Sequence, residues 1–447
     1  MKNYARFFPW VIVAVFALSI YSLASMRLSN TDEYLSQLAQ AREYSANGLL
    51  VDARAAYDEI LDDYPSIETA IEVGEMYIAY DDYTTATTWG KKILLKEYPT
   101  DSETYEFVIQ VAIATGNYSL AFTTYAECVS REVVSDQVEL LMQDIWYVYN
   151  LNNSFEEVGI YSNTQGYVAV AQDGKWGYAD TTGQLKVAYQ YESAGVFSDG
   201  MAPIVDETGE AYYIDTSGNK KFVSSYIVTE DSGLLMQDFS MMLNDIIVGY
   251  DGAYWNYYKV SSREQFLGGY LGATLFNGGV AAVTYDGTTW MLINSQGEQV
   301  GTDTYEEVLT DTKNVACRST ALIVKMNGSY YLVNQMGEKI TETAYLDAVG
   351  FNESSYAAVK KSTGWVYVDA AGVEQDFGTY EQAQSFSNGL AAVMVDGLWG
   401  YIDTTGTLAI PAIFDDATIF SAFGSSFVKE QGDDEWSLLR LISEMYL

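Results

Sequence analysis

The C-terminal part of the chain repeats one short pattern of apolar stretches and turns. Residues 389–421 read GLAAVMVDGLWGYIDTTGTLAIPAIFDDATIFS, and residues 166–198 read GYVAVAQDGKWGYADTTGQLKVAYQYESAGVFS. Both copies place Asp-Gly between two alternating stretches, which is typical of a type I′ hairpin because both central residues of that turn need positive φ. The repetition therefore predicts a series of short antiparallel strands that begins after Asn152.

The tryptophan that opens the second strand of each copy gives the number of copies. Ala211 and Tyr330 replace it in two divergent copies, and the others have Trp176, Trp255, Trp290, Trp365, Trp399 and Trp436. Eight hairpins are therefore predicted. A second turn recurs at Asp180–Gly183, Asp215–Gly218, Asn294–Gly297, Asn334–Gly337, Asp369–Gly372 and Asp403–Gly406. We interpret these Asp and Asn residues as turn caps and not as calcium ligands, since their spacing is not that of an EF-hand loop.

The first and last copies are incomplete in complementary ways. The final hairpin, SFVKEQGDDEWSLLRLI, lacks the aromatic-acid segment that follows the other hairpins, and FEEVGIYSNTQGYVAV at residues 155–170 supplies such a segment at the start. This complementarity indicates a ring in which both ends share one blade and leave no open sheet edge. We predict that residues 152–447 form an eight-bladed β-propeller, with an open β-solenoid as the alternative.

Three features of this region resemble the WG (KWG) repeat of exported and surface bacterial proteins: the Trp-Gly strand, the Asp-x-x-Gly turn and the Phe-Ser-x-Gly-x-Ala ending. The resemblance is close in the first, sixth and seventh copies. It is weak in the third, where Asn256 replaces Gly and residues 268–279 disturb the spacing. The resemblance implies a scaffold with no assigned chemical activity.

Residues 31–151 show helical periodicity. Residues recur at multiples of 34 positions: Pro65 and Pro99, Gly48 and Gly116, Ala53 and Ala121, Tyr57 and Tyr125. They resemble the tetratricopeptide repeat, with copies at 31–66, 67–100 and 101–134 and a capping helix over 136–151. The middle copy departs from the pattern, with Thr87 and Lys91 where the others have Ala and Tyr. The resemblance implies stacked helical hairpins with a partner-binding concave face, and a simple spacer is the alternative.

The N-terminal segment determines the expected compartment. Residues 7–26, FFPWVIVAVFALSIYSLASM, carry no charge and are long enough to cross a hydrocarbon layer of about 30 Å as a helix. Lys2 and Arg6 precede this stretch, which places the N-terminus in the cytoplasm and the bulk of the chain outside the cell membrane. Residues 1–30 are therefore predicted to be a cytoplasmic stub and a transmembrane anchor. A cleaved signal peptide, giving a secreted protein, is the alternative.

The composition excludes several classes of chemistry and partner. The chain has 23 Lys and Arg against 61 Asp and Glu, a net charge of −38, which repels nucleic acids and anionic lipids. It contains no histidine, which removes Ser-His-Asp and Cys-His catalysis and His-ligated zinc. No Gly-rich phosphate-binding motif is present. We predict no enzymatic activity, no catalytic residues, no cofactor and no metal site.

Pairs of adjacent acids are the remaining candidates for general acid–base chemistry. All of them follow an aromatic residue at one repeat position, as expected of a structural repeat: Glu156-Glu157, Glu306-Glu307 and Asp415-Asp416. We interpret them as solvated turn or strand-edge acids.

Most aromatic residues recur with the repeat and are expected to pack blade against blade. Trp146, Tyr250 and Tyr254 lie outside the register and are better candidates for stacking on a ligand. Cys128 and Cys317 lie in different predicted domains and are expected to be buried free thiols.

These features predict a membrane-anchored extracytoplasmic scaffold whose helical repeats and propeller bind protein partners. A cell-wall or carbohydrate-binding surface module is the alternative. The acidic charge argues against binding to anionic wall polymers.

Overall fold

A computed structural model describes residues 32–446, apart from 162–165, 199, 223–242, 251–252, 260, 263, 312–313, 317–319 and 353–355. The predicted membrane span at residues 7–26 and Cys317 lie outside the described residues. Within the described ranges, no helix has both the length and the apolar character that crossing a bilayer requires.

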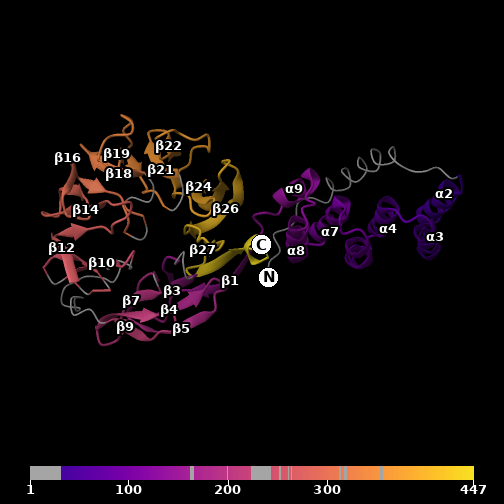
Figure 1. The fold of residues 1–447 in the computed structure, drawn as a ribbon, viewed down its shortest axis with the longest axis horizontal. Coiled ribbons are helices and arrows are strands. Elements are labelled where there is room, and N and C mark those ends of the chain that lie inside the picture. Colours follow the sequence, from indigo (N-terminus) through magenta and orange to yellow (C-terminus); the bar gives the residue numbers. More distant parts are fainter. Residues whose placement is uncertain are drawn as a thin grey trace. The chain divides into compact units, whose positions relative to one another are not determined.

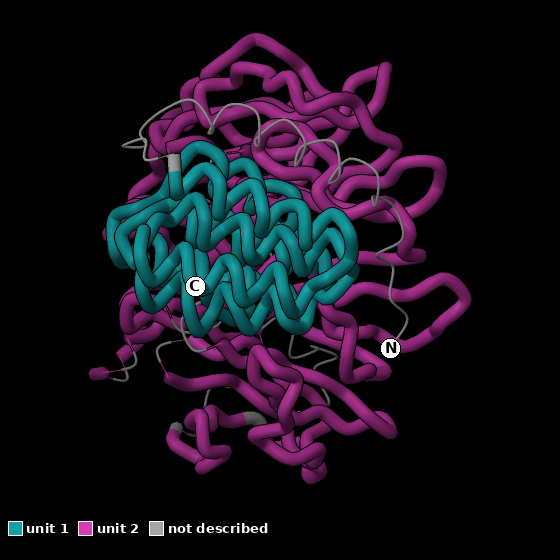
Figure 2. Tube along the Cα trace, turned by 90° about the vertical axis from the view of Figure 1, so that its right-hand side faces the viewer, with its two compact units in different colours: residues 1–148, 442–447 teal, residues 149–441 magenta. Residues whose placement is uncertain are grey.

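The chain divides into two compact units, which Figure 2 colours separately. Unit 1 contains residues 1–148 and 442–447, and unit 2 contains residues 149–441. The predicted boundary after residue 151 thus falls inside unit 2. The C-terminal end belongs to the helical unit and not, as predicted, to the β-domain.

Unit 1 is built from successive helical hairpins (Figure 1). The first helices of the hairpins are α2, α4 and α7, and α9 follows the last hairpin. The bounds are α2 Asp32–Ala46, α3 Leu50–Asp63, α4 Ile67–Ala79, α5 Tyr83–Trp89, η1 Gly90–Leu94, α6 Leu95–Glu97, α7 Ser102–Ala114, α8 Tyr118–Ser130 and α9 Asp136–Gln143.

Short polar side chains begin the helices and glycines join them. Four N-cap side chains each accept a hydrogen bond from the backbone N–H three residues later: Ser66, Asp82, Asn117 and Ser135. Gly48 and Gly116, between the helices of the first and third hairpins, have φ of 74° and 67°, which glycine adopts without strain. Ala53 and Ala121 are completely buried, as their predicted packing role requires.

The structure of the middle hairpin accounts for the departure of its sequence from the repeat. Asp81, with φ of 58°, takes the place of the turn glycine, and Ala86 is the completely buried alanine. The alignment of Thr87 with that alanine is therefore wrong by one residue. The π-helix η1 restores the register, because a π-turn accommodates one inserted residue within a helix.

The predicted capping helix over residues 136–151 is too long. Helix α9 ends at Gln143, and β1, Tyr149–Phe155, is a strand that pairs with β28, Trp436–Leu441. The strand contains three asparagines, which are weak helix formers. After β28, Ile442 returns to the helical unit and packs in one cluster with Val138 and Met142 of α9.

Unit 2 consists of short antiparallel sheets arranged around a ring, which is the arrangement of a β-propeller (Figure 1). In the described residues the sheets are β2–β5, β6–β9, β10–β12, β13–β16, β17–β19, β20–β22 and a seven-stranded sheet of β23–β28 with β1.

The remaining strand bounds follow in chain order. They are β2 Glu157–Val158, β3 Tyr167–Gln172, β4 Lys175–Asp180, β5 Leu185–Tyr191, β6 Ser193–Ala194, β7 Met201–Val205, β8 Ala211–Asp215, β9 Lys220–Phe222, β10 Ile246–Tyr250, β11 Trp255–Lys259, β12 Glu264–Tyr270, β13 Gly272–Ala273, β14 Ala281–Thr284, β15 Trp290–Ile293, β16 Gln299–Tyr305, β17 Glu307–Val308, β18 Ala321–Met326, β19 Ser329–Asn334, β20 Asp347–Ala348, β21 Tyr356–Lys361, β22 Gly364–Asp369, β23 Gln382–Ala383, β24 Leu390–Val395, β25 Leu398–Asp403, β26 Leu408–Ala417 and β27 Ser425–Glu430.

The predicted hairpins are present among these strands. Eight antiparallel pairs have the tryptophan position, or its substitute, at or next to the start of the second strand: β3–β4, β7–β8, β10–β11, β14–β15, β18–β19, β21–β22, β24–β25 and β27–β28.

The first and last strands of unit 2 lie in one sheet. Tyr149 of β1 is opposite Leu441 of β28, and a bulge between Asn152 and Ser154 shifts the register before Phe155 meets Trp436. Strand β26 pairs with β25 along its length and with β27 at its end. It therefore joins the last two hairpins into one sheet of seven strands. The incomplete ends of the sequence repeat are thus paired, as predicted.

Candidate functional site

Recurring tyrosines each tie one hairpin of unit 2 to the beginning of the next. They lie two residues after the tryptophan position and are completely buried: Tyr178, Tyr257, Tyr367 and Tyr401. Their hydroxyl groups donate, at 2.7–2.9 Å, to the carbonyl oxygens of Gly195, Thr274, Gln384 and Thr418 respectively. Burial raises the pKa of all four phenols. These rings hold the propeller together, which confirms the predicted packing role and leaves them unable to contact a ligand.

The recurring Asp and Asn residues are turn caps, as predicted. In each turn Oδ1 accepts hydrogen bonds from the backbone N–H groups two and four residues later, at 2.8–3.1 Å: Asp180, Asp215, Asn294, Asn334, Asp369 and Asp403. Asp206 makes the same pair of bonds in a turn that the sequence did not single out. Partial burial opposes ionisation of Asp180, but bonds from Thr182 and Lys186 outweigh it and lower the pKa.

The adjacent acids also have structural partners. The first acid of each pair accepts a hydrogen bond from the glycine N–H of a hairpin turn: Glu156 from Gly174, Glu306 from Gly328 and Asp415 from Gly432. The second acid of one pair, Glu307, accepts from the Tyr330 hydroxyl at 2.8 Å. The three pairs belong to different hairpins and form no joint acid–base site, which agrees with their interpretation as turn and edge acids.

The aromatic residues outside the repeat register have different surroundings. Trp146 packs edge-on against Phe122 and Tyr125, with ring centroids 6.2 and 5.9 Å apart, inside the helical unit. The ring stays partly exposed, so its role in stacking on a ligand remains a prediction. Tyr250 contacts Trp255, whereas Tyr254 is 47% exposed.

Cys128 is a buried free thiol, as predicted. Burial raises its pKa to about 11, so at neutral pH it is an unreactive thiol and not a nucleophile.

The first helices of unit 1 present one partly exposed face. On α4 it consists of Glu68, Ile71, Glu75 and Ile78, spaced three and four residues apart and therefore on one side of the helix. On α7 the equivalent residues are Glu103, Glu106, Gln110 and Ile113. On α2 and α9 two leucines continue the series, Leu35 and Leu140, which are 46% and 56% exposed. We call this set of residues the first-helix face.

Hydrogen bonds and charges show that the helices of this face are neighbours. Arg42 of α2 forms a bidentate ion pair with Glu72 of α4, at 2.6 and 2.8 Å. Partial burial, Glu103 of α7 and Glu68 of α4 raise the pKa of Asp101, which lies just before α7. Glu106 accepts a hydrogen bond from the Ser135 hydroxyl at the start of α9, at 2.6 Å. This face was not among the sites predicted from the sequence, although its heptad-like spacing is visible there.

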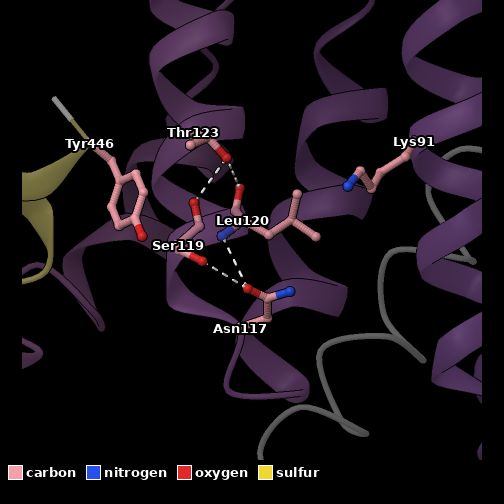
Figure 3. A pocket seen from close by; sticks show the side chains of 6 residues that line it. All are labelled: Lys91, Asn117, Ser119, Leu120, Thr123 and Tyr446. Atoms are coloured by element: carbon pink, nitrogen blue, oxygen red, sulfur yellow. Dashed lines mark hydrogen bonds between the residues drawn. The ribbon is translucent and has the colours of Figure 1, made fainter.

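Figure 3 shows a hollow of about 210 Å³ on the other side of the hairpins. It is lined by Lys91, Asn117, Ser119, Leu120, Thr123 and Tyr446. Three of its side-chain oxygens already have partners: Asn117 Oδ1 accepts from the Leu120 N–H and the Ser119 hydroxyl, and the Thr123 hydroxyl lies 2.9 Å from the Ser119 carbonyl oxygen. Its other side-chain polar groups are the Lys91 amino group, the Asn117 side-chain N–H group and the Tyr446 hydroxyl.

Comparison with known families identifies the repeat in unit 2. The family described as WG containing repeat matches residues 176–207, 378–399 and 399–430. The chain carries WG repeats. The matches begin or end at Trp176 and Trp399, each one residue after the start of the second strand of its hairpin.

Solved structures similar to the chain have low scores and low sequence identity. BamB from Moraxella catarrhalis has 12% identity over 64% of this chain and 84% of its own, with a TM-score of 0.35. Hsv2 from Kluyveromyces lactis has 9% identity over 66% and 98%, and the Cps50 (Swd1) β-propeller domain from Myceliophteria thermophila has 9% over 65% and 99%; both have a TM-score of 0.33. No curated protein matches the sequence.

Proposed function

We propose that this WG-repeat protein is a non-enzymatic scaffold whose helical unit binds a segment of a partner protein through the first-helix face. The helical unit acts as a tetratricopeptide-like array, and unit 2 is an eight-bladed propeller closed by β1 and β28. Residues 7–26 anchor the chain in the cell membrane, and both units lie outside the cytoplasm. The charge of −38 supports a protein partner over nucleic acid.

The exposed leucines of the first-helix face are the observation that carries this proposal. Leu35 and Leu140 are each about half exposed, and the partly buried Ile71, Ile78 and Ile113 lie between them along the array. Burying an exposed leucine side chain in an interface stabilises a complex by roughly 1.5–3 kcal/mol before the costs of association. In unit 2, by contrast, the recurring rings and acids are engaged within the fold.

Site-specific photo-crosslinking in cells that make the full chain tests this function. A photoreactive residue at Leu35 or at Leu140 should crosslink the same defined protein. Val51 is the matched control, because it is 84% exposed but lies on α3, away from the face. Equal crosslinking from Val51, or no protein adduct from either leucine, would contradict the proposal. Adducts that disappear on glycan digestion would favour the wall-binding alternative.

Protease added outside intact cells tests the location. It should degrade residues 31–447 and leave a membrane-embedded N-terminal fragment. Complete protection of the chain in intact cells, with degradation after lysis, would contradict an extracytoplasmic scaffold.

A further inference from the structure

Three of the four helices that form the first-helix face carry acids and no bases. Helices α4, α7 and α9 contain seven carboxylates between them and no lysine or arginine: Glu68, Glu72, Glu75, Glu103, Glu106, Asp136 and Glu139. Arg42 of α2, which reaches across to α4, is held by both oxygens of Glu72. This cation is therefore already paired and does not neutralise the other carboxylates of the face.

The Glu72 carboxylate is well satisfied, because Tyr57 of α3 also donates its hydroxyl to Oε1 at 2.6 Å. The carboxylate of Glu75, three residues further along α4, has no such partners in the described ranges. Among the described residues, no hydrogen bond or ion pair reaches its carboxylate. Burial and the neighbouring Glu72 raise the pKa of Glu75 to about 7. A partly buried carboxylate without a counter-ion is unfavourable to the isolated fold.

The same helices offer apolar surface on both sides of that carboxylate. Ile71 and Ile78 lie one helical turn before and after Glu75 and are partly exposed, and exposed Leu140 lies on α9. A ligand that satisfies this face needs apolar side chains for the leucine and isoleucines and a cation for Glu75. Anionic membranes and nucleic acids would meet like charge here, whereas a basic and apolar polypeptide is complementary.

We propose that the occupant of the first-helix face is a partner-protein segment in which lysine or arginine side chains alternate with leucine-type side chains, one of the cations pairing with Glu75. This inference rests on the proposed function and names the chemistry of its partner. Cationic side chains close to Glu75, and to the Glu68, Asp101 and Glu103 group, would relieve the repulsion between these acids.

Peptide titration of the full-length chain tests the inference. Three fluorescent peptides share leucines at every third or fourth position and carry lysine, glutamine or glutamate at the positions between. The lysine peptide should bind, the glutamine peptide should bind more weakly, and the glutamate peptide should not bind. Glu75→Gln and Glu106→Gln should each weaken binding of the lysine peptide about three- to tenfold at pH 8, as expected for partly buried ion pairs.

Non-specific attraction to an acidic protein must be separated from binding at this face. Glu59→Gln on α3 is the matched control, because it removes one exposed carboxylate that lies on a different helix and has no hydrogen bond or ion pair among the described residues. Affinity for the lysine peptide should be unchanged in this variant. An equal loss in Glu59→Gln, or equal binding of the glutamate peptide, would overturn the inference.

The crosslinking experiment distinguishes a wrong partner chemistry from a wrong proposed function. A defined protein crosslinked from Leu140 through a segment that contains no lysine or arginine would leave the scaffold function standing. The same result would overturn the proposed chemistry of the partner.

Discussion

The two units of this protein use their repeated polar residues in opposite ways. In the propeller, each recurring acid has a partner within its own turn: Asp403 Oδ1 accepts from the N–H groups of Thr405 and Thr407, at 2.8 and 3.1 Å. In the helical unit, Glu75 lies at a repeat position with no partner among the described residues. The recurring acids of the propeller therefore stabilise their own turns, whereas the carboxylate of Glu75 in the helical unit is left without a hydrogen bond in the part of the chain that the structure describes.

This difference indicates where binding energy is available. A polar group whose hydrogen bonds are completed inside its own repeat stabilises the fold and gains little from a ligand. A partly buried charge without a counter-ion destabilises the fold, and such departures from local consistency are expected at functional sites. Under the proposed function, the WG repeats act as a frame and the first-helix face is where a partner binds.

The largest effects should come from the tyrosines that join the propeller sheets. Tyr367→Ala should lower the free energy of unfolding of unit 2 by about 3–5 kcal/mol, because it opens a cavity at a completely buried ring. Tyr367→Phe keeps the ring but leaves the Gln384 carbonyl without its donor, and should cost about 1–3 kcal/mol. Hydrogen exchange in β21 and β22 during urea titration measures the change within unit 2.

The exposed Tyr254 supplies the control for that experiment. Tyr254→Phe should leave exchange in β21 and β22 unchanged. If Tyr367→Phe were equally silent, the hydroxyl-to-carbonyl bond would add nothing to the cohesion of the sheets, and the contrast with the helical unit would weaken.

The propeller could be predicted from the sequence because its signals are local and repeated. Each Asp-Gly turn and each opening tryptophan specifies one hairpin, and the shared sheet of β1 and β28 follows from comparing the two incomplete copies. The tyrosine hydroxyl bonds were not predicted, since their acceptors lie 17 residues away in the next sheet. A search for tyrosine two residues after the tryptophan would have found these positions.

The helical unit was harder to predict because its decisive features are not local. The π-helix at Gly90–Leu94 shifts the middle repeat by one residue, and its benefit depends on close packing: a Cβ on Gly90 would meet Val108 at 2.7 Å. The end of α9 depends on β1 joining a strand that lies almost at the C-terminus. Which side of α4 faces outward likewise depends on α3 and α7, so the sequence alone could not single out Glu75.

The next largest effect should be a pH-dependent change in the free energy of unfolding of unit 1, which differs in direction from that of unit 2. The pKa of Glu75 is raised to about 7 in the folded chain, so protonation favours folding, and this contribution is lost as the pH rises from about 4.5 through 7. Glu75→Gln removes the unfavourable ionisation. It should therefore stabilise unit 1 at pH 8 by about 1–2 kcal/mol, and by little at pH 4. Urea unfolding monitored by hydrogen exchange in α4 and α7 provides the measurement.

The turn acids of unit 2 should respond in the other direction. Hydrogen bonds lower the pKa of Asp180 and Asp206, so their contribution is present above the unfolded value near 4 and is lost as the pH falls further. Unit 2 should lose stability below about pH 4, while unit 1 gains it on going from pH 8 to 5. Parallel pH profiles for the two units would contradict the contrast between them.

A smaller effect is expected from removing one turn cap. Asp403→Ala leaves two backbone N–H groups of an exposed turn to water and should lower the stability of unit 2 by about 1 kcal/mol. Asp434→Ala, in the exposed loop between β27 and β28 and without a hydrogen bond to the carboxylate among the described residues, is the control and should be neutral. Equal losses in both variants would show a general charge effect and not a cap.

The smallest effect should come from Asp403→Asn, and it decides between a turn cap and a cation ligand. Asparagine keeps the accepting Oδ1, and Asn294 and Asn334 already make the same two bonds at 3.0 Å or less in equivalent turns. The change in unfolding free energy should therefore stay below about 0.5 kcal/mol. Added calcium should not shift the melting temperature of either protein. If Asp403→Asn were as damaging as Asp403→Ala, or if calcium stabilised only the parent chain, the negative charge itself would be required. The turn acids of the propeller would then be a second recognition surface, and the division of roles between the two units would fail.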